Sequence, residues 1–198
     1  MKNFFIALAV ILFAATASWA LEIIPKIGVD IPSTVMYDES PASADDTKKE
    51  QETKLGFNIG LEIRGKISRF FSWGAGIEYL GNRGWVEENY TDFSFLPVYG
   101  SVIFYPWGDW NKAKPYVKAN AGYNVAAWNS LGTGIEGRLY WGGALGAEYK
   151  NFVGELVAAQ YFAEIEDPGS IEMKYTKIGF TLGYKIDISN LFKSSEEN

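Results

Sequence analysis

Charged side chains recur at every second position in several segments of this chain, and they are the residues with the greatest capacity for chemistry. The 198 residues include no histidine and no cysteine, so the commonest general base and every thiolate metal ligand are missing. Because buried charges must be paired, we expect a structural network of opposite charges and no catalytic, cofactor-binding or metal-binding site. The expected members of this network are Lys26, Asp30, Glu62, Arg64, Glu78, Lys118, Glu148, Glu155 and Lys185.

Three local patterns resemble functional motifs but fit structural roles better. A GxGxxG string occupies residues 132–137, yet a strand and not a helix is predicted after it, which disfavours a dinucleotide-binding loop. The acidic segment 38–52 lacks the ligand spacing of a calcium loop. Glu62 and Glu78 could form a catalytic carboxylate pair, but facing charges in a barrel are more often ion pairs.

The elements that carry the charges are predicted to be β-strands, because apolar and polar residues alternate strictly. The segment LGFNIGLEIR, residues 55–64, places its large apolar residues on one face and its glycines and charges on the other. Residues 73–79, 117–125, 139–149 and 177–186 show the same alternation. Residues 22–31, 93–105 and 152–162 are weaker strands, and in the last two both faces are apolar, so their inward rows stay open. About eight strands are therefore expected.

The predicted connections alternate between long and short. Long polar segments follow the first, third, fifth and seventh strands, at residues 32–54, 81–91, 126–138 and 163–170. The other links, at residues 65–72, 106–114 and 150–151, are mostly shorter. This alternation is typical of bacterial outer-membrane barrels, in which the long loops face outside.

Aromatic residues near both strand ends favour the same arrangement, since membrane interfaces select such rings. The alternative is that aromatic residues simply favour strands. By the short links the ring is expected to contain Trp73, Tyr105, Trp107, Trp110, Tyr116, Tyr149, Phe152 and Tyr184, and by the long loops Tyr79, Trp85, Tyr90, Phe93, Tyr123, Trp128 and Trp141.

Glycines indicate which face of the strands points inward. Period-two patterning also fits a soluble lipocalin-type barrel, in which the apolar rows point inward. Glycine on a solvated outer face would weaken a strand without benefit. We therefore expect the apolar rows to meet lipid and the polar rows to fill a narrow lumen, although several charges could instead reach the mouth and stay hydrated. The glycines of the polar rows are Gly56, Gly60, Gly74, Gly76, Gly122, Gly142, Gly146, Gly179 and Gly183.

Residues 1–20 have the features of a secretory signal peptide, with Lys2 at the start, an apolar stretch and small residues before a cleavage point near Ala20. An uncleaved anchor is disfavoured, because the apolar stretch is shorter than the ~20 residues of a spanning helix. We expect residues 21–188 to form the barrel and residues 189–198 a polar tail. The formal net charge of −6 disfavours a nucleic-acid partner.

Two segments resemble the small OmpA-type or opacity-type family of outer-membrane barrels. KIGFTLGY, residues 177–184, resembles the C-terminal signal that the outer-membrane assembly machinery reads. KPYVKANAGYNV, residues 114–125, resembles the fifth strand of the family. One departure is that about a dozen residues follow the signal, which usually ends such chains. The signal would be carried by Lys177, Gly179, Leu182 and Tyr184.

The pattern and the resemblance together imply an exported outer-membrane barrel without turnover, whose exposed loops have a structural or surface-interaction role. Its expected partners are outer-membrane lipid and lipopolysaccharide, the assembly machinery and a surface partner of the loops. One alternative is a narrow porin-like channel for ions or small apolar solutes. A second is a lipid-modifying enzyme, which is disfavoured because the barrel enzymes of this kind rely on histidine.

Overall fold

The computed structural model describes residues 21–38, 49–83, 92–108, 112–129, 135–165 and 171–189. The predicted signal peptide lies outside these ranges, as do residues 190–198 of the predicted tail and three residues of the predicted aromatic rings, Trp85, Tyr90 and Trp110. In the ranges described, no helix is long and apolar enough to cross a membrane.

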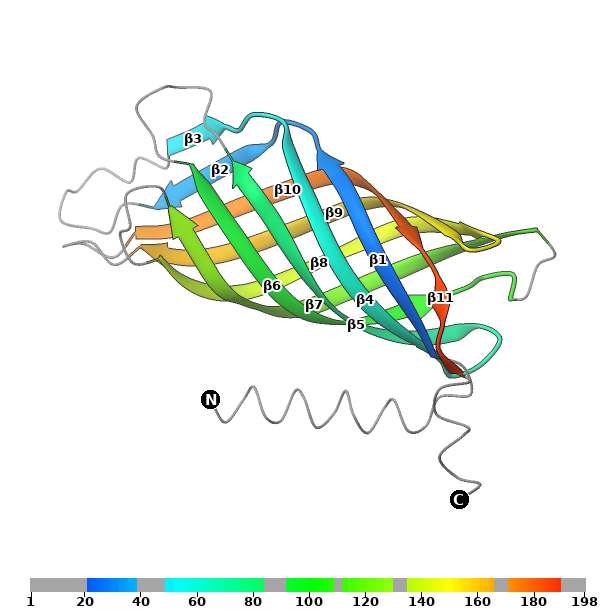
Figure 1. The fold of residues 1–198 in the computed structure, drawn as a ribbon. Helices are drawn as coiled ribbons and strands as arrows, with labels where there is room; N and C mark the ends of the chain where they lie inside the picture. Colours follow the sequence, from blue (N-terminus) through cyan, green and yellow to red (C-terminus); the bar gives the residue numbers. More distant parts are fainter. Residues whose placement is uncertain are drawn as a thin grey trace, which may run out of the picture.

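Eight long strands form a closed wall. Each strand is antiparallel to its neighbours, and β1 pairs with β10 to complete the circle, with Lys26 opposite Gly183. The strands run obliquely around the barrel axis (Figure 1). The predicted all-β, closed antiparallel up-and-down barrel of eight strands is thereby confirmed. The wall strands are β1 (Leu21–Asp30), β4 (Gly56–Lys66), β5 (Phe71–Arg83), β6 (Phe93–Phe104), β7 (Ala113–Asn129), β8 (Ile135–Tyr149), β9 (Phe152–Ile165) and β10 (Ile171–Tyr184).

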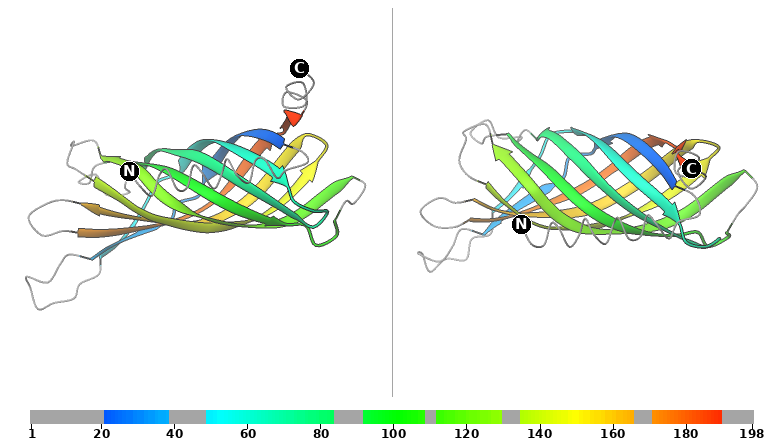
Figure 2. Two further views of the ribbon diagram at one scale, coloured as in Figure 1. Left: turned by 90° about the horizontal axis from the view of Figure 1, so that it is seen from below. Right: turned by 60° about the horizontal axis from the view of Figure 1, so that its bottom comes forward.

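Among the residues that the structure describes, three short strands extend this wall. β2 (Thr34–Asp38) pairs with the part of β10 that β1 does not reach, and β3 (Lys49–Glu52) pairs with β2. β11 (Ile186–Asp187) pairs with the start of β1 at the other end of the barrel. β2 and β3 extend from the end of the barrel opposite to β11 (Figure 2). The prediction of a loop over residues 32–54 was therefore wrong in part, because the backbone of β10 offers hydrogen-bonding partners to this polar segment.

The two ends of the barrel differ in their connections. At one, the short-turn end, residues 67–70 join β4 to β5, and Lys150 and Asn151 join β8 to β9. At the other, the loop end, the strands run further than predicted, since β7 continues to Asn129 and β8 begins at Ile135. Polar residues predicted loops there, but the backbone ladder continues through them, because the main-chain hydrogen bonds between strands do not depend on side-chain polarity.

Apolar side chains cover the outside of the wall. Ile59 and Leu156 are 55% and 62% exposed. Their chain neighbours Asn58 and Glu155 are buried inside the barrel. The apolar rows therefore face outward and the polar rows inward, which is the reverse of the lipocalin-type arrangement.

Strands β6 and β9, whose inward rows the sequence left open, also alternate. In β6 the buried inward residues include Tyr99 and Ser101, and in β9 they include Val153, Glu155 and Val157. The residues that alternate with these inward residues, such as Val102 in β6 and Leu156 in β9, are exposed on the outside. The inward rows of both strands mix polar and apolar residues, which is why period-two patterning alone did not identify these rows.

The glycines of the inward rows make room for tyrosine rings. A Cβ atom on Gly76 would lie 2.6 Å from the ring of Tyr99, and one on Gly146 would lie 2.3 Å from the ring of Tyr116. Both distances are too short for a carbon–carbon contact, so each ring lies directly on the glycine of a neighbouring strand. The glycine-rich rows thus allow a narrow lumen to hold large side chains.

Candidate functional site: the lumen of the barrel

Glu62 of β4 lies at the centre of a charged network near the short-turn end. Its Oε2 accepts hydrogen bonds from the ammonium groups of Lys26 (2.6 Å) and Lys118 (3.2 Å) and from the hydroxyl of Tyr99 (3.1 Å). Its Oε1 accepts two from the guanidinium of Arg64, at 2.8 and 3.1 Å. The Glu62 side chain is fully buried, so these donors replace the water that a carboxylate otherwise binds.

Glu155 of β9 is the second acceptor of this network. Its two oxygens accept hydrogen bonds from Lys118 (2.6 Å), Tyr116 (2.7 Å) and Lys26 (3.0 Å). Each of the two lysines therefore bridges Glu62 and Glu155. Because Lys26 comes from β1 and Lys118 from β7, strands from opposite sides of the wall are joined through the lumen.

Glu148 of β8 forms the part of the network closest to the short-turn end. It accepts hydrogen bonds from Arg64 (2.7 Å), the Tyr105 hydroxyl (2.7 Å) and Lys185 (2.6 Å). Lys185 also lies 3.5 Å from Glu22, and its side chain keeps 15% of its surface exposed. We refer to the whole network, from Glu62 to Glu148, as the charged layer; its members are Lys26, Glu62, Arg64, Lys118, Glu148 and Glu155, with the hydroxyls of Tyr99, Tyr105 and Tyr116.

A smaller charged group lies nearer the loop end. Lys177 of β10 donates to Glu78 and lies 3.5 Å from Asp30, which accepts a hydrogen bond from Asn58 at 2.8 Å. The structure thus brings all nine charged residues named from the sequence to the lumen or its mouth, in two groups with Lys185 at the edge. Lys177, assigned from the sequence only to the assembly signal, joins them; it shares the inward row of β10 with Gly179, so its position along that row could have identified it.

Two tyrosines that we expected in the outer aromatic ring are in the lumen instead. Tyr105 and Tyr116 are buried and donate to Glu148 and Glu155. The prediction considered only that both tyrosines lie near strand ends. It did not consider which face of the strand they occupy, although Tyr116 lies on the same face as Lys118. Phe93 was also wrongly assigned to the outer ring, because it is buried against Phe95 and Tyr175. Ring residues that do expose large outer surfaces are Trp107, Tyr123, Trp141, Tyr149, Phe152 and Tyr184.

The half of the lumen nearer the loop end is filled by a second, aromatic layer. The ring of Tyr161 lies 4.8 Å from that of Tyr140 and 5.6 Å from that of Phe95, measured between ring centres. Val35 of β2 is fully buried in the same cluster, so the strand that was predicted to be a loop helps to fill the barrel. The aromatic layer comprises Val35, Leu80, Phe93, Phe95, Tyr140, Tyr161, Met173 and Tyr175.

Little space is left between the two layers. A cavity of about 20 Å³ lies beside Lys118, Asn120 and Tyr140, which is room for about one water molecule. The Oδ1 atom of Asn120 is buried without a partner among the described residues, and a water in this cavity would supply one. A larger cavity, of about 220 Å³, opens at the short-turn end.

The chemistry open to the charged layer is limited by its pairing. Each of its carboxylates, on Glu62, Glu148 and Glu155, accepts hydrogen bonds from cationic side chains. None of them is therefore presented to a substrate as an unpaired base. In the part of the chain that the structure describes, no group of three or more acidic residues is arranged to hold a metal ion.

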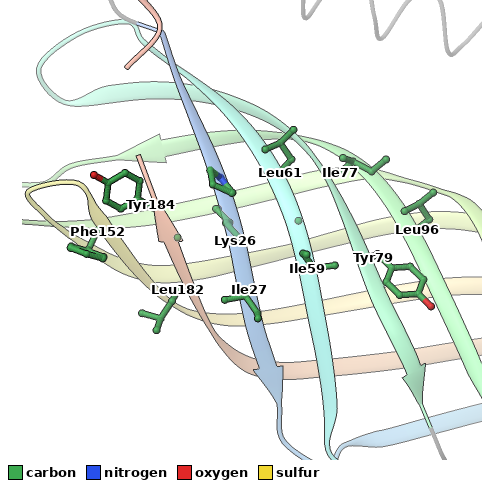
Figure 3. A pocket seen from close by; sticks show the side chains of 13 residues that line it. Lys26, Ile27, Ile59, Leu61, Ile77, Tyr79, Leu96, Phe152, Leu182 and Tyr184 are labelled. Atoms are coloured by element: carbon green, nitrogen blue, oxygen red, sulfur yellow. The ribbon is translucent and has the colours of Figure 1, made fainter. Parts of the chain in front are cut away.

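The outer surface over β10, β1, β4 and β5 carries a shallow apolar depression of about 740 Å³ (Figure 3). Ile27, Ile59, Leu61 and Leu182 line it. Because its lining is almost entirely apolar, the depression fits hydrocarbon and belongs to the same outward surface as the rest of the apolar rows.

Comparisons with known proteins concern the fold of this chain. No protein-family model and no curated protein matches it. The structure is similar to the crystal structure of the outer membrane protein OprG from Pseudomonas aeruginosa, over 85% of this chain and 97% of that one, with 16% identity and a TM-score of 0.54. It is also similar to Neisserial surface protein A, over 84% of this chain and 97% of that one, with 14% identity and a TM-score of 0.51. The chain therefore has the fold of the small eight-stranded outer-membrane β-barrels, as the resemblance to the OmpA-type family implied.

Proposed function

We propose that this protein is a non-conducting outer-membrane barrel without turnover, which acts through its loop end in a structural or surface-interaction role. The observation that carries the proposal is the filled lumen. The charged layer joins strands across the barrel, and the aromatic layer packs the remaining half. An eight-stranded barrel is narrow enough for side chains to close it completely.

The charged layer supports a role as a rigid scaffold. Lys26 and Lys118 each bind two carboxylates that come from different strands. Moving one strand relative to another would separate these pairs and leave charges buried without partners, which is strongly unfavourable. A wall held in this way fixes the strand ends from which the loops begin.

The outer face of the loop end supports action outside the membrane. Arg138 of β8 donates to Glu164 of β9 and to Glu172 of β10 on the outside of the wall. Charged side chains on an outer barrel face are unfavourable in hydrocarbon, so we infer that these strands rise above the lipid here. The loops would then reach lipopolysaccharide or a surface partner.

The proposed route to the membrane uses export and the assembly machinery. Along the proposed assembly signal, Leu182 and Tyr184 are exposed on the outside while Lys177 and Gly179 face inward. Fractionation of the producing cells is expected to recover the protein in the outer membrane, with a gel mobility that changes on heating, as folded barrels show. Recovery of a freely soluble monomer without detergent would contradict this localisation.

Conductance in planar bilayers tests the central claim. The purified protein is expected to give no current steps, while its heat-modifiable mobility in vesicles of the same lipid demonstrates insertion. Discrete current steps would overturn the proposal in favour of the porin-like alternative. Incubation with phospholipid and lipopolysaccharide is expected to leave both chemically unchanged, and turnover of either would favour the lipid-modifying enzyme.

A further inference from the structure

The strand pairing that closes the wall is interrupted near the start of β1. Lys26 is the first residue of β1 that pairs with β10, opposite Gly183, and before it Ile23 lies opposite Ile186 of β11. Three steps along one strand match three along the other, so β10 and β11 follow β1 in a single register (Figure 1). Among the described residues, Pro25 and the residue before it have no pair across this line. We call the part formed by residues 26–31 and 178–183 the main seam, and the part formed by residues 21–23 and 186–189 the terminal seam.

Pro25 explains the interruption. Along an antiparallel strand, successive N–H groups point alternately to the two neighbouring strands. The N–H of Ile31 donates to the carbonyl of Ile178 at 3.0 Å, and Pro25 lies six positions earlier, so its nitrogen also faces the C-terminal strand. Proline has no N–H, and the carbonyl of Tyr184 opposite therefore receives no hydrogen bond from β1. The pairing of Pro25 with Leu61 of β4 is intact, because the missing donor points away from β4.

The terminal seam has hydrogen bonds of its own. The N–H of Ile188 donates to the carbonyl of Leu21 at 2.9 Å, and the N–H of Leu21 donates to the hydroxyl of Ser189 at 2.9 Å. The N–H of Ser189 donates in turn to the carboxylate of Asp187 at 2.8 Å. Every residue of the terminal seam keeps part of its surface exposed. Hydrogen bonds at an exposed strand end open more readily than those in the interior of a wall.

A buried apolar cluster behind the interruption limits how far an opening can spread. Ile24, the residue before Pro25, is fully buried in the lumen. On the C-terminal strand, the N–H of Lys185 donates to the carbonyl of Asn151 at 2.7 Å, which holds this strand against the turn between β8 and β9. Separation of the terminal seam would therefore stop at the interruption and leave the charged layer closed. The cluster comprises Ile24, Ile103, Tyr105, Tyr116 and Val153.

We propose that the terminal seam is a conformational element that opens and closes independently of the rest of the barrel. Pro25 removes the hydrogen bond that would join it to the main seam, so the two parts of the closure are not held together cooperatively. Residues 186–189, which follow the proposed assembly signal, complete the wall on the far side of the proline. When they separate from β1, the backbone edge of residues 21–23 becomes accessible at the short-turn end. This role is additional to the proposed function, which concerns the loop end.

Amide hydrogen exchange of the folded protein in detergent micelles, followed by NMR and corrected for intrinsic exchange rates, tests the proposal. The N–H groups of Ile23 and Ile188 face the terminal seam. They are expected to exchange at least about tenfold faster than those of Ile27 and Leu182 in the main seam, a factor that one or two hydrogen bonds supply. Ile24 is the internal control, because its N–H faces β4. Slow exchange at Ile24 shows that β1 itself stays in place.

Pro25→Ala tests the cause of the independence. The variant supplies a donor opposite the carbonyl of Tyr184 and is expected to slow the exchange of the Ile188 N–H about fivefold, the factor that corresponds to one added hydrogen bond. The matched control is Pro115→Ala, the same change in β7 at the short-turn end. This control is expected to leave the exchange of Ile188 unchanged.

Ser189→Ala tests the terminal seam from the other side. The variant removes the acceptor of the Leu21 N–H and is expected to accelerate the exchange of Ile188 about fivefold. Its control is Ser68→Ala, which removes a serine acceptor from the turn between β4 and β5 and is expected to have no effect on Ile188.

Three results would overturn the proposal. The first is equal exchange in the terminal and main seams. The second is exchange at Ile24 as fast as at Ile23, since the whole start of β1 would then be fraying. The third is an equal effect of Pro25→Ala and Pro115→Ala. A conducting barrel would leave these measurements unaffected, because exchange is measured independently of conductance.

Discussion

The charged layer and the aromatic layer fill the same lumen by different physical means. In the charged layer each carboxylate has fixed donors, and Glu62 binds two lysines and an arginine. In the aromatic layer, rings such as Phe95 and Tyr161 stack with their centres 5.6 Å apart, and the dispersion attraction between them depends less on direction than a hydrogen bond does. The first layer therefore specifies which strands lie together, while the second accepts small changes of shape. The half near the short turns should tolerate single substitutions poorly and the half near the loops should tolerate them well.

The largest expected effect comes from removing the central charge. Glu62→Gln leaves Lys26, Lys118 and Arg64 buried with one counter-charge fewer, and it should lower the free energy of unfolding by about 3 to 5 kcal/mol. Urea unfolding in lipid vesicles, followed by tryptophan fluorescence, measures this change. The matched control is Glu22→Gln at the partly exposed mouth, which should cost less than about 1 kcal/mol. Equal losses would remove the distinction between the interior of the charged layer and its edge.

A change on the other side of the same strand tests whether the charges must be inside. Leu61, the chain neighbour of Glu62, is 45% exposed on the outer face. Leu61→Arg should cost about 2 to 4 kcal/mol if this face meets lipid near the middle of the membrane. Folding yield and unfolding free energy in vesicles measure the effect, with Leu61→Ala as the uncharged control. Equal folding of the arginine variant and the original chain would argue against the outward orientation.

Tyr116→Phe tests the directional contacts of the charged layer without changing its charge. The hydroxyl donates to Glu155 at 2.7 Å, and hydrogen bonds to charged groups contribute about 1.5 to 3 kcal/mol. The variant should lose a free energy of unfolding in that range. Val117→Ala, on the exposed side of the same strand, serves as the control and should have a smaller effect.

The smallest effect is expected in the aromatic layer. Phe95 is fully buried between Tyr161 and Tyr175, but Phe95→Leu removes no polar contact and leaves only a small cavity, so the loss should be about 1 kcal/mol. The same unfolding assay compares it directly with Tyr116→Phe. A larger loss at Phe95 than at Tyr116 would reverse the proposed order of tolerance between the two layers.

The wall could be predicted from the sequence because a strand exposes alternate residues to two different environments. The alternation around Leu61 and Glu62 identified the strand, and the glycines of its polar row indicated which face points inward. The pairing inside the lumen could not be predicted in the same way, since which carboxylate meets Lys26 depends on the tilt and stagger of strands far apart in the chain. The charged members of the charged layer could therefore be predicted from the sequence, but its three tyrosines and the pairing within it could not.

The remaining errors have local causes. Tyr105 and Tyr116 were assigned to the outer ring because they lie close to strand ends. The alternation of strand faces, which places Tyr116 on the same face as Lys118, was not taken into account. The hairpin of β2 and β3 was missed because β2 is only five residues long, β3 is polar, and the pairing of β2 depends on the backbone of β10. A strand that forms mainly by pairing with the edge of a neighbouring strand does not need an alternating pattern of apolar and polar residues.

The closure of the wall between β1 and β10 has a consequence for how the barrel forms. In the described residues this seam joins five residue pairs, whereas β9 and β10 share fourteen. The seam also pairs the first and the last long strands of the barrel, so it can form only after the last long strand has been synthesised. Its formation therefore bears the entropic cost of closing a very long loop. The β1–β10 pairing should therefore form last during assembly and separate first when force is applied to the barrel. The pairing of β2 with β10 extends this region of strand pairing.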